Sequence, residues 1–292
     1  MVAFIRYQLT RVLMRLAIFF PDRIYLHLLY LLVMGKRLHL RHPKLFSEKV
    51  QWLKLNQKSP LFTELVDKLA VKEQVSHTIG AEFVCPVLQI WDTVDQIDYS
   101  ELPNQFVLKT THGGGNTGVV ICHDKSHFDQ VAAKAVLKES MNSNIYTRYR
   151  EWPYKNVRRR IFAEQYLGKD ITDYKFYCCH GEVVCILLCT GRQSGQLKYF
   201  FLDTEWHICP YNEDSIAMGN LFPVPPPSNL QQLLQTASKL SEFFPFVRID
   251  LYDVEGHIYF GEYTFYPASG IDPKKTVDFD KMLGRKIHLP IE

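Results

Sequence analysis

Apolar positions in the first part of the chain recur at helical spacing. Residues 12–34 are rich in apolar side chains, but charged residues and a proline interrupt them, so no run of about 20 apolar residues predicts a spanning helix. A further helix is expected to begin with Ser47 as its N-cap, because serine suits that position and Glu48 suits the first turn. Another is expected over 61–79, ended by Gly80.

Beyond residue 80 the pattern changes to short apolar runs that are typical of strands. Two helices interrupt them, one opened by Ser126 with Asp129 and one opened by Ser228 with Gln231, both as capping boxes. Because hairpins rather than β–α–β units dominate, the pattern predicts an α+β fold. The expected strands are 83–91, 106–110, 118–123, 160–167, 174–179, 183–190, 198–202, 206–208, 246–254 and 257–265.

Composition narrows the function classes. A chain of 292 residues with 47% hydrophobic residues is long enough for a large core, which excludes a wholly disordered protein. The net charge of +3 is too small to favour a nucleic-acid partner, but it is compatible with acidic small ligands. Seven cysteines without a C-x-x-C pair predict buried, reduced thiols, and these are typical of the cytoplasm.

The N-terminal region has the pattern of a basic amphipathic helix. Arg6, Arg11 and Arg15 flank leucine and valine residues at helical spacing, and no signal-peptide cleavage pattern follows. Such a helix either packs on the body of the protein or lies on an acidic membrane surface. Residues 1–35 are therefore a candidate for peripheral contact at the inner face of the membrane.

A glycine cluster supplies the first candidate site. The stretch is Lys109-Thr-Thr-His-Gly-Gly-Gly-Asn-Thr-Gly118, placed between two expected strands. It is not a Walker A loop, because the lysine precedes the glycines and a strand follows. Glycines let backbone N–H groups approach phosphate oxygens closely, and the lysine adds a positive charge. The alternative is a flexible hairpin tip.

The last expected hairpin supplies a second site. A three-residue loop over 255–257 would place Asp250 opposite Glu262, on the face that also carries Arg248 and Thr264. Two facing carboxylates repel each other unless a cation lies between them, and Mg²⁺ is commonly bound by one or two carboxylates with phosphate oxygens. An ion pair between Arg248 and one of the acids would serve equally well.

A third set of polar residues follows the strand at 160–167. Glu164 and Gln165 at its end could face an adenine, and Asp173 with Lys175 lies on the next strand. Arg192 follows the strand after that and could face the same site. An ordinary strand end and a solvated arginine are the alternatives.

Taken in order, these motifs resemble the ATP-grasp superfamily, and most closely its TupA-like branch, whose members often accompany polysaccharide genes. The order is a root lysine, a glycine-rich hairpin, a strand ending in glutamate, a D-x-K strand and a late R-x-D…E-x-T hairpin. The stretches that carry the resemblance are 42–54, 67–72, 106–109, 173–177, 246–252 and 260–265.

The resemblance implies an ATP-grasp fold in which two α+β subdomains clasp ATP. Residues 1–58 would form a helical N-terminal segment and 59–105 a region preceding the ATP-grasp domain. That domain would span 106–292, divided into 106–165 and 166–292.

The resemblance also implies a set of site residues. Those expected to bind ATP are Lys109, Gly113, Gly114, Gly115, Glu164, Gln165, Tyr166, Leu167 and Asp173. Those expected to bind Mg²⁺ are Asp250, Glu262 and Thr264, the last of which stands where many relatives have asparagine. Those expected to act in catalysis are Lys175, Arg192 and Arg248.

The function implied is that of an ATP- and Mg²⁺-dependent carboxylate–amine ligase working through an acyl phosphate. It would join an amine donor, such as an amino acid, to an acidic sugar of a surface polysaccharide or its precursor. One alternative is a glycosyltransferase, which often binds its nucleotide sugar through a metal and a D-x-D motif, and the stretch from Arg248 to Asp253 is not one. A second alternative is a non-catalytic nucleotide-binding partner of a polysaccharide assembly.

Overall fold

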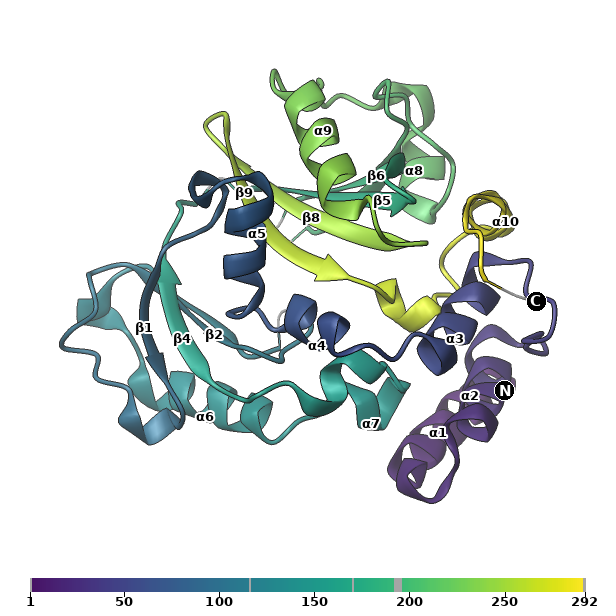
Figure 1. Ribbon diagram of the computed structural model, residues 1–292, viewed down its shortest axis with the longest axis horizontal. Helices are drawn as coiled ribbons and strands as arrows, with labels where there is room; N and C mark the ends of the chain where they lie inside the picture. Colours follow the sequence, from purple (N-terminus) through teal and green to yellow (C-terminus); the bar gives the residue numbers. More distant parts are fainter. Residues whose placement is uncertain (1, 116, 170, 192–195, 291–292) are drawn as a thin grey trace.

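Two antiparallel sheets with helices around them make up the molecule (Figure 1). The computed structural model describes residues 2–115, 117–169, 171–191 and 196–290. The predicted α+β class is confirmed. No helix in these described ranges combines the length and the apolar character that crossing a membrane requires.

The first part of the chain is helical, as expected. Helices α1 (Val2–Arg15) and α2 (Asp22–Met34) pack against each other, and α3 (Phe46–Asn56) follows. Figure 1 shows α1 and α2 beside α3 at the edge of the molecule, outside both sheets. Their inward-facing side chains form a hydrophobic cluster of their own around Tyr25 and Leu26.

The start of α3 differs from the expectation. The helix begins at Phe46, so Ser47 lies inside it and not at the N-cap. The backbone N–H of Ser47 donates to Asp280 Oδ1 at 2.7 Å, and its hydroxyl donates to Oδ2 at 2.8 Å. Asp280 belongs to α10 (Val277–Lys286), so a carboxylate distant in sequence satisfies the first turn of α3.

The single helix expected over 61–79 is wrong. The structure has α4 (Pro60–Val66) and α5 (Val71–Ile79), separated by a turn at 67–70. Asp67 Oδ1 accepts hydrogen bonds from the backbone N–H groups of Leu69 at 2.9 Å and Ala70 at 3.0 Å, which stabilises this turn. The helical spacing of apolar residues therefore continues across the turn at 67–70, although the bonds of Asp67 interrupt the helix there.

The first sheet has the strand order β1-β4-β2-β3. Its strands are β1 (Val87–Trp91), β2 (Phe106–Thr110), β3 (Val119–Cys122) and β4 (Ile161–Gln165). Helix α6 (Gln130–Met141) packs against β2 and β3, and the short α7 (Ile145–Tyr149) follows it. Asp129 alone caps α6, accepting from Val131 and Ala132, so the capping box expected at Ser126 is wrong.

The second sheet has the order β7-β6-β5-β8-β9. Its strands are β5 (Thr172–Cys179), β6 (Glu182–Thr190), β7 (Lys198–Leu202), β8 (Val247–Val254) and β9 (His257–Thr264). Helix α9 (Leu230–Ser241) packs against β5, β6 and β8, and the short α8 (Glu213–Met218) contacts β7. Asn229 precedes α9 without a side-chain cap, so the capping box expected at Ser228 is also wrong.

Short 3₁₀ turns join several of these elements. They are η1 (Ala17–Phe19), η2 (Ala81–Phe83), η3 (Val94–Gln96), η4 (Lys125–His127), η5 (Trp152–Asn156), η6 (Gly219–Leu221) and η7 (Pro267–Gly270).

The largest hydrophobic core lies under the second sheet and includes side chains of α3, α4, α9 and α10. A smaller core lies under the first sheet, around Phe106 and Leu137. None of the seven cysteines, all of which lie among the described residues, forms a disulfide, and six are buried, which confirms the prediction of buried, reduced thiols.

Candidate functional site

The β8–β9 hairpin pairs Asp250 with Glu262, as expected, but by a different route. The loop expected over 255–257 is wrong, because Val254 pairs with His257 and only two residues form the turn. Glu255 and Gly256 have φ values of 54° and 86°, as in a type I′ turn. A bulge at Gly261 then restores the pairing, where a Cβ would lie 3.0 Å from the backbone oxygen of Asp250.

Cations from the same sheet neutralise the first of these acids. Arg248 Nε donates to Asp250 Oδ1 at 2.6 Å, and Nη2 donates to Oδ2 at 2.7 Å. Lys175 on β5 lies opposite in the ladder and donates to Oδ2 at 2.5 Å. The ion-pair alternative raised by the spacing is therefore realised in this state. Arg248 also donates to the hydroxyl of Thr264 at 2.9 Å and thereby lies between both strands.

The second acid is held by a lysine to which the motif analysis gave no role. Lys68 Nζ donates to Glu262 Oε2 at 2.9 Å. Burial by itself would raise the pKa of Glu262, but Lys68, Arg248 and Lys175 together hold it at about 2. Lys68 lies in the turn between α4 and α5, so the unpredicted helix break is what brings it to the site. In the sequence, Lys68 could have been found through the stretch 67–72, which is one of those that carry the family resemblance.

A second charged cluster lies on the first sheet. Glu164 on β4 accepts from Lys109 on β2, and Lys72 Nζ lies 2.5 Å from its other carboxylate oxygen. Burial alone would raise the pKa of Glu164, but the two lysines lower it. Lys72, on α5, also donates to the backbone oxygen of Cys85 at 2.8 Å. Lys72 is a second residue to which sequence reasoning assigned no function.

The two clusters share one electrostatic neighbourhood. Burial alone would lower the pKa of Lys109, but Glu164 and, more weakly, Glu262 raise it. Lys68 also joins the sheets physically, because its backbone N–H donates to the oxygen of Thr111 at 3.0 Å. Thr111 follows β2 and begins the glycine-rich loop. Residues from both sheets and from the α4–α5 turn therefore converge on one region.

The glycine-rich loop is a hairpin between β2 and β3, in the expected position. A Cβ on Gly113 would lie 2.2 Å from the backbone oxygen of Thr117, so no larger residue fits there without a shift of the backbone. Gly115 has a φ of 56°, and open space surrounds its Cβ position. The root of the loop is packed while its tip is accessible, as a phosphate-covering loop requires. Asn116 lies outside the described residues.

The remaining predicted residues are placed as follows. Asp173 is buried on β5, with Oδ2 2.9 Å from Lys175 Nζ, so it supports the lysine that contacts Asp250. Gln165 ends β4 and is exposed, and Tyr166 and Leu167 after it are half-buried. Arg192 lies outside the described residues.

A buried polar network follows β9. Lys54 of α3 is fully enclosed, and its Nζ donates to Ser269 Oγ at 2.6 Å and to the Ser269 backbone oxygen at 2.7 Å. Burial, opposed by Lys54, raises the pKa of Glu151 to about 7. Ala268 and Ser269 have φ values of 46° and 58°, a left-handed conformation that non-glycine residues rarely adopt. No sequence signal marked this network.

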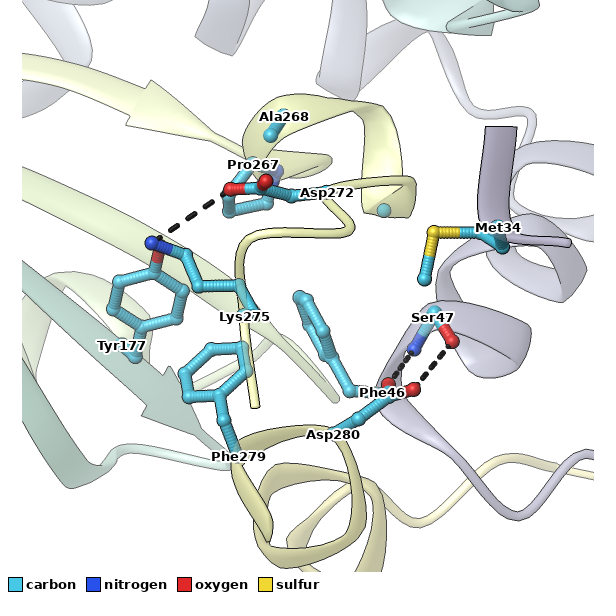
Figure 2. A pocket seen from close by; sticks show the side chains of 11 residues that line it. Met34, Phe46, Ser47, Tyr177, Pro267, Ala268, Asp272, Lys275, Phe279 and Asp280 are labelled. Carbon is cyan, nitrogen blue, oxygen red and sulfur yellow. Dashed lines mark hydrogen bonds and ion pairs between the residues drawn. The ribbon is translucent and has the colours of Figure 1, made fainter. Parts of the chain in front are cut away.

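Figure 2 shows a small cavity beside this loop, lined by Ala268, Lys275, Tyr177 and neighbouring side chains. Lys275 Nζ lies 3.7 Å from a carboxylate oxygen of Asp272. Tyr177 pairs with Arg248 in the ladder, so its side chain lies on the face of the sheet that also carries Arg248 and Asp250. Its volume of about 30 Å³ has room for little more than ordered water.

The donor set fits Mg²⁺ bound together with phosphate. In the part of the chain that the structure describes, no group of three or more His, Cys, Asp or Glu side chains is arranged to hold a metal. Asp250 and Glu262 instead offer two carboxylates, and in this structure lysine and arginine side chains neutralise them. Mg²⁺ keeps several water or phosphate ligands and needs only one or two carboxylates.

The chain contains one D-x-D sequence, Asp278-Phe-Asp280, in α10. Asp280 accepts from Ser47 and from Lys36 Nζ at 3.2 Å, whereas Asp278 is exposed. This sequence forms a helix contact and has no place in the charged clusters.

Comparisons with known proteins place the chain in a family. A D-alanine–D-alanine ligase from Helicobacter pylori is 12% identical with a TM-score of 0.47, over 83% of this chain and 69% of that one. One from Bacillus anthracis is 15% identical with a TM-score of 0.44, over 77% and 66%. An L-amino acid ligase from Bacillus licheniformis is 12% identical with a TM-score of 0.46, over 81% and 53%.

Similarities at this level carry no argument about activity, and no curated protein matches the chain significantly. A sequence model described as TupA-like ATPgrasp, however, matches residues 48–288, which is most of the chain. The ordered motifs, the paired acids and this match agree, and the protein belongs to the TupA-like ATP-grasp family.

Proposed function

We propose that this protein is an ATP- and Mg²⁺-dependent ligase that joins an amine to the carboxylate of an acidic sugar in polysaccharide synthesis. The supporting observation is the pairing of Asp250 with Glu262 across β8 and β9, surrounded by cations from the second sheet and from the α4–α5 turn. Buried acids and cations in such numbers fit a ligand that carries phosphate charge and a metal.

The two sheets serve as the two lobes. We assign residues 106–165 to one lobe and 166–292 to the other, with 1–58 as the helical N-terminal segment. Strand β1 pairs with β4, so 59–105 completes the first lobe. ATP would lie where Lys68, Lys109 and Glu262 approach one another.

Asp250 and Glu262, with the hydroxyl of Thr264, would hold Mg²⁺. The metal would supply positive charge against the triphosphate and the transferring phosphoryl group. Its binding would require Lys68, Lys175 and Arg248 to release the acids, and these cations would then be available to phosphate oxygens. A site that is electrically balanced without metal therefore becomes one that favours the metal–nucleotide complex.

Lys109 and Lys72 would contact phosphate oxygens under the loop formed by Gly113, Gly114 and Gly115. The end of β4, from Glu164 through Gln165, Tyr166 and Leu167, would line the adenine. Asp173 would hold the ribose or, through Lys175, the phosphate. Each role places a charged or backbone group against a ligand group of opposite character.

The reaction needs no nucleophile from the protein. An oxygen of the sugar carboxylate attacks the γ-phosphorus of ATP, and ADP leaves with the bridging oxygen. The amine nitrogen then attacks the acyl carbon, the phosphate leaves, and the nitrogen loses a proton. Arg248, with Arg192 as a second contact, would stabilise the negative charge on the acyl phosphate. The protein contributes positioning and charge neutralisation.

Replacement of Glu262 by Gln tests this proposal. The amide keeps the shape but removes the charge that the metal needs, so ADP release with uronic acids and amino acids should fall by about 10²–10³-fold. Glu182→Gln, on β6, removes a surface carboxylate paired with Lys286 at 2.7 Å and should leave turnover unchanged. Circular dichroism checks that both variants fold. Unreduced ADP release by Glu262→Gln would exclude the metal assignment.

A further inference from the structure

Exposed apolar side chains gather in the first helices. Of the 22 large hydrophobic side chains exposed in the described part of the chain, 11 lie within residues 4–31. That stretch is about a tenth of the sequence, so the density is far above that of the remaining surface. These side chains are Phe4, Ile5, Tyr7, Leu9, Val12, Leu16, Ile18, Phe19, Ile24, Leu28 and Leu31, and we call them the apolar face.

The apolar face is not the core of the helical pair. Helices α1 and α2 bury a different set of side chains against each other, around Leu13, Ala17 and Leu26. On α1, Ile5, Leu9 and Val12 recur at helical spacing and form one stripe, which Leu16 continues directly after the helix. At the tip of the pair, Ile18 and Phe19 are 73% and 74% exposed. The hairpin is therefore folded without this face, which remains unpartnered.

The hairpin is held firmly to the body. The buried Arg150 donates to the backbone oxygen of Ala17 at 2.5 Å and lies 2.9 Å from a carboxylate oxygen of Asp22. Tyr25 donates to the backbone oxygen of Arg148 at 2.6 Å. The apolar face consequently has a fixed direction relative to the rest of the molecule.

Positive charge is concentrated in the same part of the chain. Residues 1–47 contain eight Lys and Arg against one Asp, a net charge of +7. The whole chain is only +3, so residues 48–292 carry −4. Arg6 is structural, since it donates to the backbone oxygen of Leu32 at 2.9 Å. Positive charge is therefore concentrated at the N-terminal part of the chain, while the remainder is negative.

Much of this charge lines one groove, of about 710 Å³, between α2 and the segment 36–48. Glu48 is its one acidic lining residue, and it is bonded to His39 at 2.7 Å. Arg23 and His27 directly precede Ile24 and Leu28 on α2, so the groove adjoins the apolar face. The basic lining residues are Arg23, His27, Lys36, Arg37, His39, Arg41, His42 and Lys44.

We propose that the apolar face and this basic groove dock the protein on a bilayer containing anionic lipids. The apolar side chains enter the interface while the groove meets headgroup phosphates, a combination that is typical of peripheral helices. A second copy of the chain fits poorly, because the basic grooves of the two copies would repel each other. A soluble polyanion would leave the apolar face in water. The proposal does not depend on the proposed ligase activity.

Co-sedimentation of the full chain with vesicles tests it. The protein should bind vesicles of phosphatidylcholine mixed with phosphatidylglycerol, bind pure phosphatidylcholine at least tenfold more weakly, and be released by added NaCl. Ile18→Ser with Phe19→Ser, and separately Arg37→Glu with Arg41→Glu, should each weaken binding at least tenfold. The matched control is Val131→Ser with Val136→Ser on α6, whose side chains are 81% and 43% exposed.

Three results would overturn the proposal. The first is equal binding to neutral and anionic vesicles. The second is unchanged binding by either variant pair while circular dichroism shows native folding. The third is dimerisation in analytical ultracentrifugation that Ile18→Ser with Phe19→Ser abolishes, since the apolar face would then belong to a second copy.

Discussion

At the residue scale, the site is a set of buried charges that balance one another. Glu164 faces two lysines, and Glu262 faces Lys68 and Arg248. Ion pairs of this kind contribute little net stability, because desolvation offsets their attraction. Removal of one partner is expensive, however, because it leaves a buried charge without compensation. The pairs therefore fix positions for a charged ligand more than they strengthen the fold.

Glu164→Gln should show how much stability is lost when one partner of a buried ion pair is removed. The lysines lose their counter-charge, so the free energy of unfolding at neutral pH should fall by about 3–5 kcal/mol. Because folding lowers the pKa of Glu164, its contribution is complete above the unfolded value of about 4.3 and is lost as pH falls through the lower folded value. Urea unfolding from pH 7 to pH 3 should show the wild type and the variant converging in acid.

The matched control is Asp95→Asn, which breaks a pair with Lys138 whose side chains are 73% and 55% exposed. Its effect should stay below about 1 kcal/mol at every pH. A difference between wild type and Glu164→Gln that persists unchanged down to pH 3 would contradict the assigned cause.

At the element scale, single side chains that bond backbone N–H groups influence where helices begin and end. Asp280 from α10 supplies the carboxylate at the first turn of α3. Asp67 interrupts the apolar spacing between α4 and α5 and so presents Lys68. Each effect comes from one side chain that satisfies backbone N–H groups, and the spacing of apolar residues does not reveal it.

Asp280→Ala should therefore destabilise a helix to which it does not belong. We expect a loss of about 0.5–2 kcal/mol, the range measured for helix N-caps. Asp278→Ala, on the exposed side of the same helix α10, should change stability by no more than about 0.5 kcal/mol. Hydrogen exchange at the first turn of α3 localises the effect, and protection that is equal in both variants would argue against capping by Asp280.

At the scale of the whole molecule, the nucleotide site depends on both sheets. Lys109 and Glu164 come from the first, Asp250 and Glu262 come from the second, and Lys68 contacts both. A ligand that bridges these groups binds the folded arrangement alone and stabilises it by mass action.

Thermal unfolding should identify that ligand. ATP with Mg²⁺ at about 100 times its Kd should stabilise the protein by about 2.7 kcal/mol, and the shift should shrink when EDTA replaces Mg²⁺. A uridine diphosphate sugar with Mg²⁺ is the control and should have little effect. A larger shift with the nucleotide sugar would favour the glycosyltransferase alternative over the ligase.

The sequence by itself determined the α+β class, most strands and the family, because strand periodicity, glycine clusters and charged motifs are local signals. It also predicted the partners Asp250 and Glu262, although the turn was shorter than expected and the bulge at Gly261 compensated. The shorter turn shifts the pairing by one residue, and the bulge at Gly261 shifts it back. The pairing was right, but the loop that predicted it was wrong.

Only the tertiary structure decided which charges meet. Lys68 reaches Glu262 across 194 positions of sequence, and Lys54 reaches Ser269 across 215. No periodicity encodes such contacts, since they depend on how separate elements pack around a shared core. The same holds for the apolar face of α1 and α2. Sequence shows that a helix is amphipathic, whereas packing alone decides which of its apolar residues face water.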